Sequence, residues 1–260
     1  MTISLAIASG KGGVGKTTIA VNLAITLQRM GSRVTMMDAD FGLANAHILM
    51  GQNPKITMSD VLAGENSVED ALSEGPAGIK FLSGGSGLLD MLNLDAEARY
   101  RTIRALDEIE NQTDVLMVDT PAGASDSTLS FVLASDKVLV VIVGEPTSLM
   151  DAYAMIKAAH MEQQVDKFSV VVNMVRDADQ GMAHFEKFRA ITRRFLDVEL
   201  SYAGHVPQSQ ALRNSIVRRS PIALHPEHTR ENRAFEAIAR EVLRAPFRGG
   251  QGVRFFNSDR

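Results

Sequence analysis

The chain has 260 residues, 45% of them hydrophobic, and a formal net charge of -4. This length is enough for one large α/β domain with its own core, and the composition is not that of a disordered chain. The sequence contains no cysteine. That excludes disulfides, thiol catalysis and cysteine-held zinc or iron–sulfur clusters, and it fits a cytoplasmic location. No run of about 18 apolar residues is present, so we expect no membrane-spanning helix.

Short apolar runs rich in Val and Ile recur along the chain and barely alternate with polar residues. This pattern is typical of strands buried on both faces of a parallel sheet. The runs are residues 3–9, 33–39, 114–120, 137–144 and 168–174. Segments of helical length are residues 17–31, 95–111, 148–164 and 231–243. The alternation predicts a single three-layer α/β domain over residues 1–246, with a mostly parallel central sheet flanked by helices.

A glycine-rich loop follows the first predicted strand. Residues 10–17, GKGGVGKT, match the phosphate-binding pattern G-x-x-x-x-G-K-[ST] in full, between an apolar strand and an amphipathic helix, so we predict a P-loop NTPase fold. Backbone N–H groups and the helix N-terminus would surround the phosphates, Lys16 would reach the outer phosphates, and the Thr17 hydroxyl would reach Mg²⁺. The predicted phosphate-binding residues are Gly10, Lys11, Gly12, Gly13, Val14, Gly15, Lys16, Thr17 and Thr18.

Three aspartates stand at the ends of neighbouring predicted strands. Asp119 closes one run, and Asp38 and Asp40 close another. A single aspartate in such a place is commonly a helix N-cap, but three beside a complete phosphate loop favour metal or water binding at the carboxyl edge of the sheet. Spacing alone leaves open whether Asp38 or Asp40 positions the water. The TPAG segment at 120–123 fits a flexible switch, and SGGSG at 83–87, which lacks a lysine, fits a plain surface loop.

KGGVGKT with its early lysine, DADFG and DTPAG together resemble the deviant Walker A ATPases that include MinD and ParA. The resemblance implies slow, Mg²⁺-dependent ATP hydrolysis by a homodimer that forms when ATP is bound. It implies that Lys11 reaches across the dimer interface to the partner's ATP and that Lys16 serves its own site. Asp40 would position the water, and Thr17, Asp40 and Asp119 would serve the magnesium ion. In the same way, Asn173 resembles the residue that recognises adenine, with Pro207 nearby.

Three longer segments are similar to the FlhG/FleN branch of this family: residues 40–51, 58–82 and 188–222. Members of that branch control the number and placement of bacterial flagella, so the resemblance implies a flagellar assembly or regulatory protein as partner. The alternative is a ParA/MinD-type ATPase that positions DNA, the septum or another cargo, with DNA the weaker candidate. A reductase or metal-cluster carrier on the same fold would need ligand cysteines, which the sequence lacks.

Residues 247–260 form a predicted C-terminal tail with two interpretations that the sequence does not separate. Phe247, Val253, Phe255 and Phe256 stand among three arginines, which fits a weak peripheral contact with the inner face of the cytoplasmic membrane. Three glycines in the same segment fit a disordered end instead.

Overall fold

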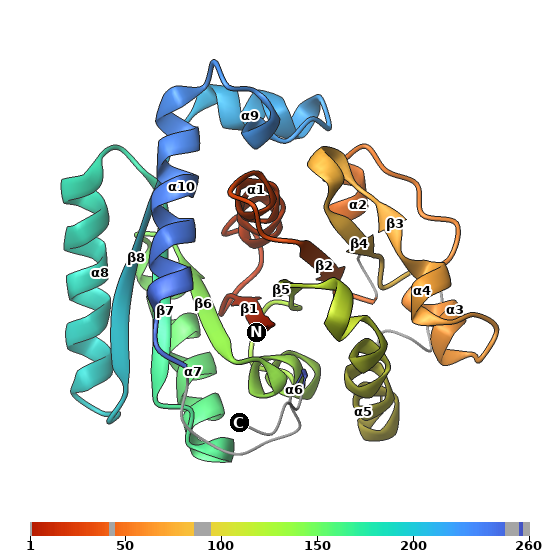
Figure 1. Ribbon diagram of the computed structural model, residues 1–260. Helices are drawn as coiled ribbons and strands as arrows, with labels where there is room; N and C mark the ends of the chain where they lie inside the picture. The colour runs from red at the N-terminus through yellow and green to blue at the C-terminus, as the bar shows by residue number, and fades with distance from the viewer. Residues whose placement is uncertain (1, 42–44, 86–94, 248–254, 257–260) are drawn as a thin grey trace.

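The computed structural model describes residues 2–41, 45–85, 95–247 and 255–256. This part of the chain forms an eight-stranded sheet between two layers of helices (Figure 1), so the predicted three-layer α/β fold is confirmed. The strands are β1 (Ile3–Ala8), β2 (Val34–Asp38), β3 (Ser73–Glu74), β4 (Lys80–Leu82), β5 (Val115–Asp119), β6 (Lys137–Ile142), β7 (Lys167–Val175) and β8 (Glu199–Pro207).

The sheet has the strand order β3-β4-β2-β5-β1-β6-β7-β8. Its pairings are parallel apart from the antiparallel β3–β4 pair. The five predicted strands correspond to β1, β2, β5, β6 and β7. The prediction missed β3, β4 and β8. β3 and β4 have two and three residues, too few for a pattern. β8 lies at an edge and mixes buried with partly exposed residues, so it does not form an apolar run.

The helices that carry the two outer layers have the following bounds. They are α1 (Lys16–Arg29), α2 (Ala46–Leu49), α3 (Met58–Leu62), α4 (Val68–Ala71), α5 (Ala96–Ala105), α6 (Asp126–Ala134), α7 (Pro146–Gln163), α8 (Ala178–Arg193), α9 (Gln210–Val217) and α10 (Thr229–Arg244), with 3₁₀ turns η1 (Pro76–Gly78), η3 (Leu106–Gln112) and η4 (Ile222–Leu224). None of the helices in the described ranges is both long and apolar enough to cross a membrane.

The period of two along each strand decides which helix layer a side chain meets. On β1, Leu5 and Ile7 belong to the core cluster that contains α1 and α10, whereas Ala6 and Ala8 belong to the cluster on the opposite face with α6, α7 and α8. A third cluster, also on that opposite face, joins β2, β4 and β5 to α3, α4, α5 and η3. Figure 1 shows α1 and α10 on one side of the sheet and α5, α6 and α7 on the other.

Two residues of the predicted tail belong to this third cluster. Phe255 is completely buried and Phe256 is 6% exposed. Residues 248–254 and 257–260 lie outside the described residues. For these two phenylalanines the structure therefore adds a third placement, inside the domain, to the two that the sequence left open.

Candidate nucleotide site

The predicted phosphate loop connects β1 to α1. Gly15 stands at the N-terminal cap of α1 with φ 86°, and among the described residues no side chain caps this helix. The backbone N–H groups of its first turn, at Lys16, Thr17 and Thr18, are therefore open to an anionic ligand. Thr17 and Thr18 are partly buried here, Gly12 and Gly13 are exposed, and Val14 is buried with 2% exposure.

Two glycines of the loop are required by close contacts. A Cβ on Gly10 would lie 2.0 Å from the backbone carbon of Asp151, because the loop passes directly against α7. A Cβ on Gly15 would lie 2.4 Å from Nδ2 of Asn173. These contacts hold the loop between α7 and the end of β7, and the positive φ of Gly15 adds a conformation that other residues rarely adopt.

Lys16 and Asp119 form a buried ion pair at the mouth of this loop. Lys16 Nζ lies 2.5 Å from Asp119 Oδ1, with side chains 10% and 1% exposed. The second oxygen of Asp119, Oδ2, is buried without a hydrogen-bond partner among the described residues. A buried carboxylate oxygen left without a partner is costly, and a hydrated magnesium ion would provide one. The donor set of this site, with a lysine, threonine hydroxyl, carboxylate and open N–H groups, fits a magnesium–nucleotide complex.

Asp38 lies beside Asp119, since the two residues are in register on the parallel strands β2 and β5. Its carboxylate accepts hydrogen bonds from the backbone N–H groups of Asp40 (3.1 Å), Asn45 (2.9 Å) and Ala46 (3.0 Å). Burial first, and then the charge of Asp119, raise the pKa of Asp38 to about 7, although the N–H groups of Ala46 and Asp40 and the charge of Lys16 oppose the rise. Asp38 therefore holds both ends of the loop that carries Asp40 through these hydrogen bonds.

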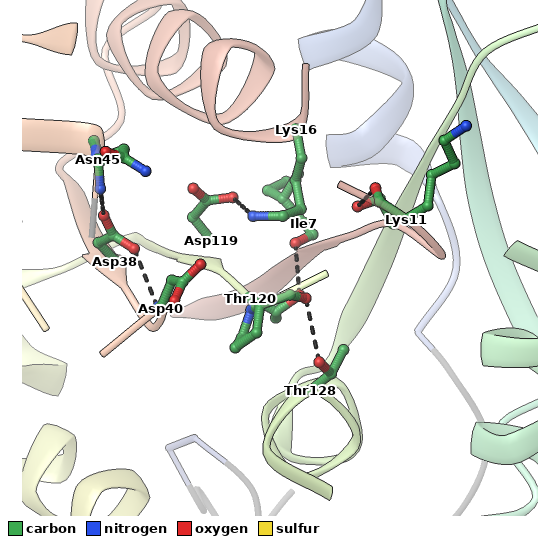
Figure 2. Close-up of polar contacts among 12 residues, drawn as sticks. Ile7, Lys11, Lys16, Asp38, Asp40, Asn45, Asp119, Thr120 and Thr128 are labelled. Atoms are coloured by element: carbon green, nitrogen blue, oxygen red, sulfur yellow. Dashed lines mark hydrogen bonds and ion pairs between the residues drawn. The ribbon is translucent and has the colours of Figure 1, made fainter. Parts of the chain in front are cut away.

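Asp40 itself is partly exposed at the same sheet edge. Figure 2 shows Asp38, Asp40 and Asp119 gathered there with Lys16. Sequence spacing left the choice of water-positioning residue open. In the structure Asp38 is 1% exposed and bonded to backbone N–H groups, whereas Asp40 is partly exposed, and the assignment of the water to Asp40 stays a prediction.

Lys11 points away from Lys16 and Asp119, as Figure 2 shows. Its Nζ lies 3.0 Å from Glu145 Oε2 and 3.2 Å from Thr147 Oγ1, at the start of α7. The Lys11 side chain is 35% exposed. The early lysine is thus held at the surface of its own protomer.

The segment after β5 is fastened to the phosphate loop. Thr120 donates its hydroxyl to the Ile7 carbonyl oxygen at 3.0 Å, and the Gly123 N–H donates to the Ser9 carbonyl oxygen at 2.8 Å. Thr128 of α6 donates to the Pro121 carbonyl oxygen at 3.2 Å. The predicted switch segment therefore connects the phosphate loop directly to α6 (Figure 2).

Asn173 and Pro207 lie near the ends of the neighbouring parallel strands β7 and β8, and their contact with adenine stays a prediction. Asn173 is buried, donates from Nδ2 to the Val14 carbonyl oxygen at 2.7 Å, and accepts at Oδ1 from the Met174 N–H at 2.9 Å. In this structure its amide thus supports the phosphate loop. Recognition of a base by the same side chain would require these bonds to be exchanged.

The expectation of a plain surface loop at 83–87 was wrong for its described part. Ser83, Gly84 and Gly85 are buried, and residues 86–87 lie outside the described residues. A Cβ on Gly84 would lie 2.7 Å from the Asp38 carbonyl oxygen and 3.3 Å from the Phe41 Cα. This glycine supports the loop of Asp40, a role without a local sequence signal because it depends on packing between distant segments.

The fold and this site define a magnesium-dependent P-loop nucleoside triphosphatase with a second lysine in its loop. A ParA family model, described as NUBPL iron-transfer P-loop NTPase, matches residues 1–243. The chain belongs to this family of P-loop ATPases, and its ligand is ATP with Mg²⁺.

Individual relatives agree with this assignment. The chain is 40% identical over 238 residues to the antiactivator FleN of Pseudomonas aeruginosa, covering 92% of this chain and 85% of that protein. It is 33% identical over 218 residues to the flagellum site-determining protein YlxH of Helicobacter pylori, covering 83% and 73%. Among solved structures, it resembles the MinC:MinD cell division protein complex of Aquifex aeolicus with a TM-score of 0.76 and 25% identity, covering 93% and 96% of the two chains.

Proposed function

We propose that this ATPase is a nucleotide-gated dimerisation switch that regulates the number and placement of flagella. The observation that carries the proposal is the 40% identity to the antiactivator FleN over 92% of the chain. The similarity to a flagellum site-determining protein adds independent support. A flagellar assembly or regulatory protein is then the expected partner.

Within the site, the proposed roles follow from position and exposure. Lys16, Thr17 and the first turn of α1 would bind the phosphates, and a bound Mg²⁺ would neutralise charge on the phosphate oxygens. On nucleotide binding Lys16 would exchange its pairing with Asp119 for the phosphates, and Asp119 would be one of the residues that hold the hydrated magnesium ion. Asp40, partly exposed beside this pair, would orient the attacking water. Asn173 and Pro207 would contact the adenine.

Lys11 is proposed to act on the nucleotide of the partner protomer. Its ammonium group lies at the protein surface and is held by Glu145 and Thr147, two residues that are themselves exposed. Since Lys16 already supplies a cation in its own site, a second cation delivered from the partner would couple hydrolysis to dimerisation.

Peripheral contact with the inner face of the cytoplasmic membrane, through residues 247–260, remains part of the proposal. Phe255 and Phe256 would first have to leave the core, where they are 0% and 6% exposed. Removing a phenylalanine from such a site costs roughly 1.5–3 kcal/mol. Membrane binding by this segment is therefore expected only in a state that releases it, and sedimentation with anionic liposomes in ATP and in ADP measures this.

The test of the proposed function is genetic. In a Pseudomonas aeruginosa strain that lacks FleN, expression of this chain should restore the parental number and position of flagella, counted by electron microscopy. The Lys16→Ala variant, expressed at the same level, should not. If the wild-type chain and the Lys16→Ala variant gave identical flagellation, a nucleotide-gated role in flagellar control would be wrong.

A ParA/MinD-type ATPase that positions another cargo is the second candidate, favoured by the structural similarity to MinD in its complex with MinC. A DNA-bound cargo predicts ATP-dependent binding to random DNA that weakens steeply with salt, whereas the net charge of -4 gives no general attraction to DNA. Iron transfer, which the family description names, is not proposed because the sequence has no cysteine to hold a cluster.

A further inference from the structure

Phe255 and Phe256 occupy a pocket formed by η3 and α6, on the face of the sheet opposite α1. Both belong to the buried cluster that contains Leu106 and Ile109 of η3 and Phe131 of α6. Phe255 has no exposed surface. We call the side chains of η3 and α6 that surround the two phenylalanines the aromatic dock.

The backbone of the dipeptide is anchored as well as its rings. The Phe255 N–H donates to the Ala134 carbonyl oxygen at 3.0 Å, at the last residue of α6. The carboxylate of Asp107 lies close to the Phe256 N–H, and its Oδ2 pairs with Arg104 Nη1 at 3.0 Å. The other oxygen of Asp107, Oδ1, is buried without a hydrogen-bond partner among the described residues. A buried carboxylate favours a nearby N–H donor, which makes this position suitable for the backbone of Phe256.

The aromatic dock is connected to the ATPase site through one short helix. Ala134 and Phe131 are three residues apart and therefore lie on the same face of α6. The Phe131 ring stacks on the Phe41 ring with centroids 6.3 Å apart. Phe41 directly follows Asp40, and it is 4% exposed. The chain of contacts thus runs from Phe255 through α6 to the residue next to Asp40.

We propose that Phe255 and Phe256 are a built-in ligand of the aromatic dock, and that their docking holds Asp40 in the position required for hydrolysis through the Phe131–Phe41 pair. The proposal rests on the proposed role of Asp40 as the residue that orients water. It assigns a function to Phe255 and Phe256 that is separate from any contact with a membrane.

The expected direction of control follows from packing. Protein cores are close-packed, so removal of two phenylalanine rings leaves a void beside α6 that neighbouring side chains fill only in part. Phe131 and Phe41 then lose support, and the loop that carries Asp40 becomes less well positioned. Displacements of about 1 Å at catalytic groups lower turnover by up to about a hundredfold. Undocking should therefore reduce kcat. ATP binding should change little, because α1, whose first turn forms the end of the phosphate loop, packs on the opposite face of the sheet from the aromatic dock.

Docking itself is tested by tryptophan fluorescence, because the sequence contains no tryptophan. Phe255→Trp introduces a single reporter into the dock, and Phe195→Trp, at a side chain that is 63% exposed, provides the matched control. We expect blue-shifted emission and weak acrylamide quenching for Phe255→Trp, and red-shifted, strongly quenched emission for Phe195→Trp. Equal emission and quenching of the two variants would overturn the proposal.

Coupling is tested by steady-state ATPase measurements on the full chain. The Phe255→Ser/Phe256→Ser variant should lose about tenfold or more in kcat, with an unchanged KM for ATP. Phe255→Leu/Phe256→Leu should retain most activity because it keeps the dock filled. A peptide with the sequence of residues 251–260, added to the serine variant, should restore kcat, and the same peptide with both phenylalanines replaced by serine should not.

An unchanged kcat in the serine variant, or no rescue by the wild-type peptide, would overturn the coupling. If the serine variant does not fold, Asp107→Asn replaces it, since this change removes the carboxylate beside Phe256 without emptying the core, and kcat should again fall. The role of Asp40 is measured separately with Asp40→Ala. Normal turnover of Asp40→Ala would refute the proposed function of Asp40, whereas normal turnover of the tail variants beside an inactive Asp40→Ala would refute only the aromatic coupling.

Discussion

Glu145 is expected to oppose dimerisation by holding Lys11 in its own protomer. Lys11 Nζ lies 3.0 Å from Glu145 Oε2, and the two side chains are 35% and 64% exposed. If Lys11 reaches into the partner's site, this pair must break in each protomer when the ATP-bound dimer forms. Glu145→Gln removes the pair in advance and should strengthen the dimer.

The size of the effect follows from the exposure of the pair. An ion pair this open to solvent contributes about 0.2–1 kcal/mol. Two such pairs break per dimer, so the gain is about 0.4–2 kcal/mol, which corresponds to roughly a 2- to 30-fold lower dimer dissociation constant. The gain should shrink at high salt, because exposed pairs are screened.

Sedimentation equilibrium with ATP and Mg²⁺ measures this constant, in an Asp40→Ala background so that ATP is not consumed. Glu162→Gln, the same charge change near the other end of α7, is the control and should leave dimerisation unchanged. In a double-mutant cycle, Glu145→Gln should have no effect once Lys11 is alanine. A weaker dimer in Glu145→Gln, or the same gain with and without Lys11, would refute the idea that Glu145 restrains this lysine.

Three charged residues of the site, Lys16, Asp40 and Asp38, can be tested in the same way. Lys16→Ala should abolish tight ATP binding in calorimetry, and it should also destabilise the chain by about 3–5 kcal/mol in urea unfolding, because Asp119 is then buried without its partner. Asp40→Ala should bind ATP and remain dimeric in sedimentation while product release in a phosphate assay falls to background; normal release would exclude Asp40 as the water-positioning residue. The pKa of Asp38 is raised to about 7 from 3.8, so the folded chain retains a proton that the unfolded chain releases, and stability from this group falls as pH rises from 4 to 7. The free energy of unfolding of the wild type minus that of Asp38→Asn should therefore decrease over this range, and a constant difference would show that Asp38 keeps its ordinary pKa.

Most of the layered fold could be predicted from sequence because buried parallel strands are apolar on both faces. The run at 114–120, for instance, corresponds to β5 (Val115–Asp119), all of whose residues are buried. β8 shows the limit of this argument. As an edge strand it contains partly exposed residues such as Ser201 and Tyr202, and no local pattern distinguishes it from a loop.

The candidate site, like the fold, could be predicted from sequence only in part. The phosphate loop could be read directly, because its glycines and Lys16 are consecutive in the sequence and the chemistry needs that spacing. The contacts of Asp38 with the backbone of Asn45 and Ala46, and of Lys11 with Glu145, could not be read, since they depend on side-chain positions. The burial of Phe255 was also beyond the sequence, because an apolar residue near a chain end fits a membrane, a partner or the domain's own core equally well.

The last prediction compares two glycines of the loop that share a backbone conformation but differ in surroundings. Gly13 has φ 80°, and no atom of the described residues lies within 4 Å of where its Cβ would be. Gly15 has φ 86°, and a Cβ there would lie 2.4 Å from Asn173 Nδ2. Gly13→Ala should therefore lower the free energy of unfolding only by the cost of a left-handed backbone conformation at alanine, about 1–2 kcal/mol. Gly15→Ala should have the same backbone cost. It should also displace the buried Asn173 amide from the Val14 carbonyl oxygen, which lowers the free energy of unfolding by about 1–3 kcal/mol more.

Urea unfolding without nucleotide measures the free energy of unfolding of both variants. Repeating it in the Asn173→Ala background shows how much of the loss in Gly15→Ala comes from the displaced amide. There the obstructing amide is absent, so Gly15→Ala should become no more harmful than Gly13→Ala. Equal destabilisation by the two alanines in the wild-type background would mean that Asn173 moves aside freely. Its bond to the Val14 carbonyl oxygen would then contribute nothing to the phosphate loop, and Asn173 could turn toward a base without cost.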